Sequence, residues 1–369
     1  MTPVDFLFFM RLFSCFSLTE VKMDLFHPQQ DPKVATCNCS ISSFKREVYP
    51  TSYLFTFVLG LTGNIISLYY FLVLYRKKNI FSSVTLYMVN LLVSDFMLVC
   101  SLPLRASYYL MDTWVFGDVA CRVITYVFYI NMYSSIYFLM VLSTMRFLAV
   151  TWPYKYVQLQ SNRSAWVVCL VVWIFVSLAS IPILKEGIVP GDDDKVSCLE
   201  LNTINITTMV NLNYATLVIG FVLPGVVITV CYIVMVYRLM KPRKVQSIKS
   251  PSYKKSCALV IIIMIIFLVC FLPYHVVRTI FLHVEKEVST NGCSNSCQYV
   301  TRVRKAAVIT LCLAAGNSCL DPVLFIFMGR NICNLYQKEA KKRSIRNNRC
   351  NLVDSPNADL QELNTKAHH

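Results

Sequence analysis

Charged side chains are scarce in this sequence. Asp, Glu, Lys and Arg make up 15% of the 369 residues, whereas a soluble domain carries about 25%. Glycine is also rare, with 10 residues, so the chain lacks the frequent turns expected of two or three small soluble domains. Hydrophobic residues reach 56%, which is more than soluble cores bury. These shortages exclude an ordinary soluble protein and predict an integral membrane protein.

Seven apolar runs are long enough to cross a bilayer, because a hydrocarbon core of about 30 Å needs about 20 apolar residues in a helix. Asp95 and Asp321 are the only acidic or basic residues in these runs apart from His275. Buried helices of a soluble protein would be shorter and amphipathic. We therefore predict an all-α membrane protein, a seven-transmembrane helix bundle. The runs are Tyr53–Tyr75, Val84–Leu104, Val123–Met145, Ala165–Leu184, Val210–Tyr237, Ser256–Val277 and Ala306–Met328.

The distribution of charge in the loops predicts the orientation. Lys and Arg gather after the first run, between the fifth and sixth runs and after the seventh, which is typical of cytosolic loops. The loop after the fourth run is acidic. We therefore expect a plasma-membrane protein with an extracellular segment 1–48, a bundle 49–329 and a cytosolic tail 330–369 that opens with a short amphipathic helix, Arg330–Lys342. The net charge of +15 then comes mainly from basic residues in the cytosolic loops, with attraction to anionic membrane lipid as a second role. It does not indicate a nucleic-acid partner.

Four cysteines are expected on the oxidising side. Cys121 lies at the outer end of the third run and Cys198 lies in the loop between the fourth and fifth runs, so a bridge between them would pin that loop over the bundle. Cys39 and Cys297 would tie the N-terminal segment to the seventh run. Sequence does not fix the connectivity, and Cys37 and Cys293 are alternatives or a third pair. Asn38 and Asn205 begin outer glycosylation sequons, and Cys333 and Cys350 are palmitoylation candidates among basic tail residues.

Polar residues inside the apolar runs are functional candidates, because ionisable groups are unfavourable in a bilayer. Asn131 and Ser135 are four residues apart on one helix face, as are Asn317 and Asp321, and Asp95 lies midway along the second run. Together they would hold a hydrated cation such as Na⁺, with Asp95 as its acidic ligand, or a network of waters. No other cofactor is predicted, and no P-loop or Gly-x-Ser-x-Gly element indicates an enzyme.

Several motifs occur in the order and spacing found in rhodopsin-like (class A) G-protein-coupled receptors, which the chain resembles from about Phe44 to Tyr336. The resemblance implies a heterotrimeric G-protein partner, a sodium pocket made of the five polar residues, and a switch that involves Arg146, Phe271 and Pro273. The motifs are Gly63-Asn64, Asn90 to Asp95, Trp173, Pro224, Phe267 to Pro273, and Asp321-Pro322.

Two positions depart from that family pattern. Met145 stands where the family places an acid before Arg146, and Phe271 stands where many relatives have tryptophan. We therefore predict a resting state held by apolar packing and the Asp95 network, without an ion pair between Arg146 and a carboxylate.

The outer half of the bundle is cationic and aromatic. Phe128 occupies the position at which amine receptors need a carboxylate, and Ala306–Met328 has no lysine for a retinal Schiff base. Arg105 and Arg278 have no acid beside them in the sequence, so a ligand carboxylate or phosphate would complete a charge-assisted bond. These features favour an anion with an apolar portion. The expected lining also includes Lys45, Arg304, Tyr108, Tyr109, Tyr129, Tyr133 and Tyr274.

Local strings such as Ser101 to Arg105, Asn131 to Phe138 and Phe271 to Thr279 resemble the cysteinyl leukotriene receptors, in particular their type 2 branch. That resemblance implies an anionic lipid agonist and coupling to Gq-type proteins and calcium release. It also implies ligand contacts at Lys45, Arg105, Tyr129, Tyr133, Arg278 and Arg304, although the type 2 branch carries histidine at the last position. Purinergic nucleotide receptors of the same fold are the alternative, and a seven-span transporter or channel is the alternative from another class.

Overall fold

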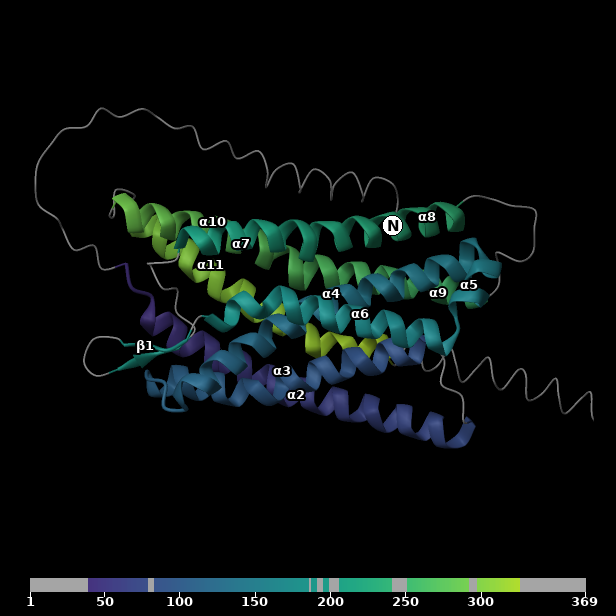
Figure 1. The fold of residues 1–369 in the computed structure, drawn as a ribbon, viewed down its shortest axis with the longest axis horizontal. Helices are drawn as coiled ribbons and strands as arrows, with labels where there is room; N and C mark the ends of the chain where they lie inside the picture. The colour runs from purple at the N-terminus through teal and green to yellow at the C-terminus, as the bar shows by residue number, and fades with distance from the viewer. Residues whose placement is uncertain are drawn as a thin grey trace, which may run out of the picture. The chain divides into compact units, whose positions relative to one another are not determined.

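The computed structural model describes residues 39–78, 83–185, 187–190, 195–198, 206–240, 251–291 and 297–325. All of them belong to one compact unit, Cys39–His369. The described residues include seven helices long and apolar enough to cross a membrane, which confirms the predicted seven-helix bundle (Figure 1). The predictions for Cys37, Asn38, Asn205, Cys293, Cys333, Cys350 and the tail helix Arg330–Lys342 concern residues outside the described ranges.

The helices follow the apolar runs but extend beyond most of them. The first helix begins at Ser42, before the first apolar run. Its opening turns carry charged residues, which interrupt the apolar run but do not interrupt the helical backbone. The bounds are α2 Ser42–Lys78, α3 Ser83–Met111, α4 Gly117–Thr151, α5 Pro153–Leu159, α6 Asn162–Ser180, α7 Ile206–Thr216, α8 Leu223–Met240, α9 Pro251–Ile266, α10 Leu272–Asn291 and α11 Cys297–Ala315, with a helical continuation of α11 over residues 317–325.

Prolines shape the fifth and sixth spans. A proline inside a helix removes one N–H donor and presses its ring against the preceding turn. A π-helical segment ends two residues before each proline. The segments are η3 (Leu217–Val222), before Pro224, and η5 (Phe267–Phe271), before Pro273. Single-turn π-segments of this kind often occur at functional sites. Here they divide each span into two helices.

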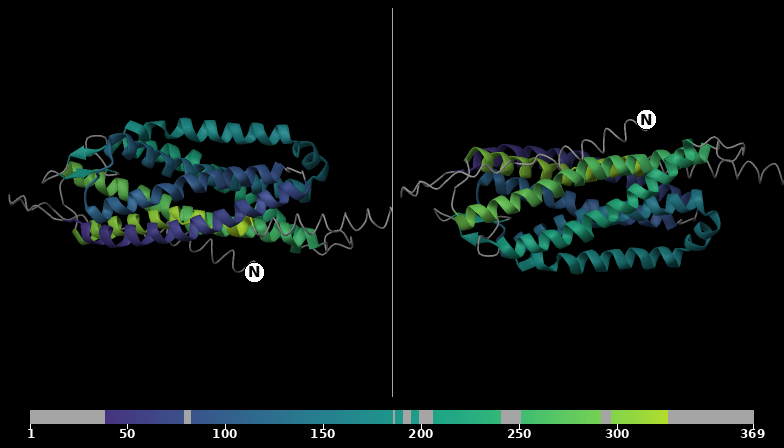
Figure 2. Two further views of the ribbon diagram at one scale, coloured as in Figure 1. Left: turned by 90° about the horizontal axis from the view of Figure 1, so that it is seen from below. Right: turned by 90° about the horizontal axis from the view of Figure 1, so that it is seen from above.

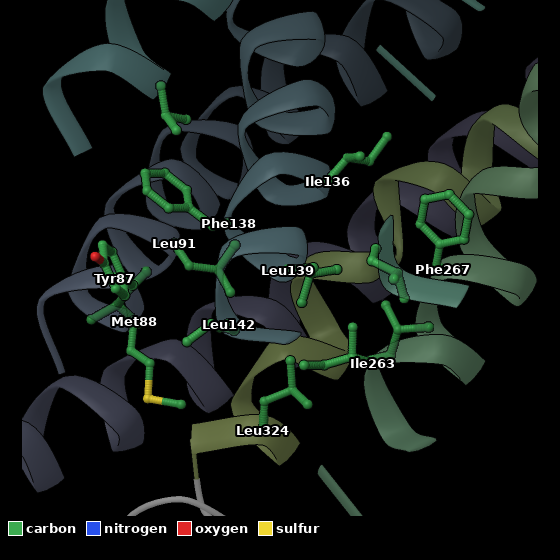
Figure 3. Packing of buried hydrophobic residues seen from close by; sticks show 14 of the residues in the cluster. Tyr87, Met88, Leu91, Ile136, Phe138, Leu139, Leu142, Ile263, Phe267 and Leu324 are labelled. Atoms are coloured by element: carbon green, nitrogen blue, oxygen red, sulfur yellow. The ribbon is translucent and has the colours of Figure 1, made fainter. Parts of the chain in front are cut away.

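Helices that are neighbours in the chain also pack against each other. Figures 1 and 2 show α2 beside α3 and α10 beside α11, and α4 contacts α3, α6, α8 and α9. The side chains between these helices are apolar: Leu91, Leu139, Leu142, Ile263 and Leu324 meet in one cluster (Figure 3). In a bilayer such packing is stabilised by close contact between helices rather than by escape from water.

Apolar side chains also cover the outer surface of the bundle. Trp166, Leu170 and Leu178 of α6 are each about 60% exposed. An exposed apolar surface of this extent is unusual for a soluble monomer. It suits a helix that faces lipid.

Both disulfides that the sequence indicated are formed, and both lie at one end of the bundle, which we call the disulfide end. Cys121–Cys198 joins α4 to the loop before the fifth span, with Cα atoms 5.8 Å apart. Cys39–Cys297 joins the residues before α2 to the start of α11, with Cα atoms 5.5 Å apart. The loop also forms a short antiparallel pair, β1 (Val189–Pro190) with β2 (Val196–Ser197).

Candidate functional site

Arg105 places its guanidinium group inside the disulfide end of the bundle. The residue is only 3% exposed, and its guanidinium carbon lies 4.6 Å from the centroid of the Phe128 ring. Nη2 donates a hydrogen bond to the carbonyl oxygen of Ile124 at 3.0 Å. Among the described residues, Nε has no hydrogen-bond partner and no Asp or Glu forms an ion pair with this arginine. The group is therefore a buried positive charge without a counter-charge from that part of the chain.

Two tyrosines of α2 that sequence reasoning missed lie next to Arg105. Tyr49 stacks on Tyr109 with ring centroids 4.2 Å apart, and Tyr53 lies 5.3 Å from Tyr49. The hydroxyl of Tyr53 is buried beside the Arg105 guanidinium but makes no hydrogen bond within the described chain. The two tyrosines are four residues apart, so they share one helix face. That spacing is the signal that would have found them.

Arg278 of α10 lies near the same group of tyrosines, although it is far from Arg105 in the sequence. It is half-buried, and its guanidinium carbon lies 5.7 Å from the Phe281 ring. Tyr129, Tyr274 and Tyr49 lie within electrostatic range of it, and Tyr49 is also within range of Arg105. No acid in the described ranges forms an ion pair with Arg278. The fold thus brings both predicted arginines to one set of tyrosines.

The inner side of this region is aromatic. Tyr133 lies against Gly220 of η3 so closely that a Cβ there would be 2.7 Å from the tyrosine ring. His275 is buried and stacks on Phe221 at 4.4 Å, and its Nδ1 lies 2.9 Å from the carbonyl oxygen of Phe271. If Nδ1 carries the proton, the buried Nε2 is an acceptor, and it has no partner in the described part of the chain.

Two predicted lining residues, Tyr108 and Arg304, make contacts within the protein. Tyr108 packs on Trp114 and its hydroxyl accepts a hydrogen bond from the backbone N–H of Cys198 at 3.3 Å, so it holds the loop. Arg304 makes two hydrogen bonds to the carboxylate of Glu285, at 2.6 and 2.8 Å, and a third to the carbonyl oxygen of Cys39. Lys45 is half-buried in the first turn of α2, four residues before Tyr49.

We refer to the group formed by Arg105, Arg278, Tyr49, Tyr53, Tyr109, Tyr129, Tyr133 and Tyr274 as the two-arginine cluster. Its two guanidinium groups are strong, directional donors for oxyanions. Its aromatic faces are apolar. The arrangement can therefore bind a negatively charged head and cover an apolar chain.

A second polar group lies deeper in the bundle. Asn131 donates to Asp95 Oδ1 and to Ser94 Oγ, each at 3.2 Å, and Ser94 bonds Ser134 at 2.7 Å. The carboxyl group of Asp321 lies within electrostatic range of that of Asp95. The sequence had not singled out Ser94 and Ser134, whose hydroxyls complete this network.

Many polar atoms in this deep group are buried without a hydrogen-bond partner in the described chain. They are Asp95 Oδ2, Ser135 Oγ, both side-chain polar atoms of Asn317 and both carboxylate oxygens of Asp321. Two adjacent buried carboxyl groups need a proton or a cation to offset their repulsion. Among the described residues, no group of three or more His, Cys, Asp or Glu could hold a metal ion. The donor set fits a monovalent, partly hydrated cation better than a chelated divalent metal.

The predicted switch residues occupy the core of the spans. Phe271 is fully buried in η5, 6.3 Å from Phe267, and Phe267 stacks on Phe221 at 4.9 Å. Met145 is buried beside Arg146, and Arg146 lies within electrostatic range of Tyr156. Met145 thus packs in the main apolar cluster of the bundle.

Residues 63–325 match the family model of the 7 transmembrane receptor (rhodopsin family). The chain belongs to that family. Rhodopsin-family relatives cover most of the chain. Human cysteinyl leukotriene receptor 2 is 42% identical over 306 residues, 83% of this chain and 85% of that receptor. Human cysteinyl leukotriene receptor 1 is 38% identical over 300 residues, 80% of this chain and 86% of that receptor.

A third relative is named for a different ligand. Lysophosphatidic acid receptor 6 of Gallus gallus is 32% identical over 312 residues, 83% of this chain and 98% of that receptor. The names of all three relatives refer to anionic lipids. The chain is thus a multi-pass receptor of the rhodopsin family, similar to receptors named for lipid mediators.

Proposed function

We propose that this receptor binds an anionic lipid mediator, a cysteinyl leukotriene, at the two-arginine cluster. Arg105 and Arg278 bind the carboxylates of the head group, and the surrounding tyrosines cover the apolar chain. Arg304 is left out of the primary anion site because Glu285 already occupies its guanidinium group.

The observation that carries this proposal is the burial of Arg105 without an acidic partner among the residues that the structure describes. A charge moved out of water loses hydration free energy, and an uncompensated buried ion destabilises a protein by several kcal/mol. A ligand carboxylate would supply the missing charge and accept hydrogen bonds from the guanidinium group. A cationic amine would instead be repelled, and Phe128 offers it no carboxylate.

The choice of a lipid over a nucleotide depends on the aromatic surroundings. Phosphate would suit two guanidinium groups equally well. The inner side of the cluster is aromatic, because His275 stacks on Phe221 and meets the ring of Tyr133 edge-on, and we propose that the apolar chain packs against these rings. The relatives named for leukotrienes and lysophosphatidic acid support the same choice.

Signalling would take place at the opposite end of the bundle. We propose an extracellular N-terminus, a membrane bundle of residues 49–329 and a cytosolic tail, with the disulfide end outside, where bridges persist. Arg146 and Phe271 would change packing when α9 moves about Pro273, and a Gq-type protein would dock and cause calcium release. The Asp95 group would bind Na⁺ in the resting state.

A calcium-release assay in transfected cells tests this proposal. The cells receive cysteinyl leukotrienes, lysophosphatidic acid and nucleotides, and each is repeated with Arg105→Ala and Arg278→Ala. We expect responses to leukotrienes that are lost in both variants at normal surface expression. Responses to nucleotides but not to lipids, or unchanged potency in the variants, would refute the assignment.

A further inference from the structure

Arg304 and Glu285 form a two-pronged ion pair at the mouth of the disulfide end. Nε of Arg304 lies 2.6 Å from Oε1 of Glu285, and Nη2 lies 2.8 Å from Oε2. Nη1 donates to the carbonyl oxygen of Cys39 at 2.9 Å. The side chains are 24% and 19% exposed respectively, so water reaches the pair. The glutamate presents to the arginine the same carboxylate fork that a ligand acid would present.

The pair lies directly outside the two-arginine cluster. Glu285 follows Arg278 by seven residues in α10, which is two helical turns on the same face and about 10 Å toward the mouth. Arg304 precedes Val308 by one turn in α11, and Val308 packs with Tyr49 and Tyr53. The ion pair therefore lies nearer to the end of the bundle than Arg278 does.

We propose that Glu285 is an internal anion that occupies Arg304 and thereby limits how many acidic groups of a ligand the receptor binds. This inference rests on the proposed function. The ligand acid and Glu285 compete for one guanidinium group. A partly exposed pair is weak enough to exchange. Glu285 thus sets the charge selectivity of the site.

Four variants test the proposal: Glu285→Gln, Arg304→Gln, the double variant, and Glu287→Gln as a matched control at an exposed acid two residues further along α10. Binding of a radiolabelled cysteinyl leukotriene is measured beside that of its fully esterified form. We expect Glu285→Gln to raise affinity for the acid by about fivefold to tenfold, because the carboxylate that accepts from Nε and Nη2 of Arg304 is removed. We expect Arg304→Gln to lower it, because Glu285 then repels the ligand.

The two single variants are expected to change affinity in opposite directions, which separates competition for Arg304 from a purely structural role of the ion pair. If the pair only held α10 to α11, both single variants would shift affinity in the same direction and the ester would follow the acid. That result, or a Glu285→Gln variant that binds like Glu287→Gln, would overturn the inference. In either case loss of binding in Arg105→Ala would leave the proposed function standing. A wild-type receptor that does not bind the leukotriene would overturn both.

Discussion

The guanidinium carbon of Arg105 lies 4.6 Å from the centroid of the Phe128 ring. An aromatic face attracts a cation but does not neutralise it. Phe128 occupies the position at which amine receptors carry a carboxylate, and its ring also contacts Arg105. We propose that Arg105 pairs with an acidic group of the ligand. This pairing links the choice of ligand charge to a single contact between α3 and α4.

Placing an acid at Phe128 tests this relationship. In Phe128→Asp the new carboxylate would pair with Arg105 and take the place of the ligand acid. We expect agonist potency to fall by about 10- to 100-fold, the loss of one buried charge-assisted bond. The measurement is calcium release at matched surface expression. Phe128→Leu keeps the site free of acid and should retain most of the response. Equal potency in Phe128→Asp and Phe128→Leu would argue against an anion at Arg105.

The hydroxyl of Tyr53 is expected to contact the ligand, because it is buried beside Arg105 and lacks a partner in the described chain. Tyr53→Phe removes that oxygen and leaves the ring packing intact. We expect ligand affinity to fall by about three- to tenfold, the value of one hydrogen bond. Tyr69→Phe, at a 70% exposed position of the same helix, is the matched control. A Tyr53→Phe receptor with unaltered affinity would remove Tyr53 from the site.

The apolar runs were sufficient to predict the seven-helix bundle, because the backbone of a membrane span must form its hydrogen bonds within one helix. They did not predict where the helices end. Glu285 lies beyond the predicted sixth run, yet α10 continues to Asn291. Tyr49 was missed for the same reason, since it lies in a helical turn that follows charged residues.

Only some side-chain contacts between helices could be predicted from the sequence. The pairing of Asp95 with Asn131 was foreseen because both lie inside predicted spans. The ion pair of Arg304 with Glu285 depends on side-chain orientation across a loop, which no spacing rule fixes. Sequence could propose cations for the site, but only the structure showed that Arg304 pairs with Glu285 whereas, among the described residues, no acid forms an ion pair with Arg105 or Arg278.

The close approach of Tyr133 to Gly220 predicts a packing constraint. A methyl group at Gly220 would lie 2.7 Å from the tyrosine ring, and a ring between helices has little room to move. We expect Gly220→Ala to destabilise the receptor by about 1–3 kcal/mol, the usual effect of overpacking. Thermal unfolding of the detergent-solubilised receptor measures this. Adding Tyr133→Ala should recover part of the loss, and a double variant no more stable than Gly220→Ala would contradict the contact.

The deep polar group predicts sensitivity to sodium. Na⁺ bound between Asp95 and Asp321 would stabilise the resting packing, so agonist affinity should be lower in sodium chloride than in choline chloride at equal ionic strength. Asp95→Asn should abolish the difference, whereas Asp118→Asn, at a partly exposed acid near the disulfide end, should preserve it. Radioligand binding in the two salts is the measurement. A sodium effect that survives Asp95→Asn would place the ion elsewhere.

The most direct test of the account is an experimental structure of the receptor with a cysteinyl leukotriene bound. We predict carboxylate oxygens of the ligand within about 3 Å of the guanidinium nitrogens of Arg105 or Arg278, with the apolar chain against Tyr133 and Phe221. A ligand whose acids lie away from both arginines, with Arg105 still lacking a counter-charge, would contradict the central claim.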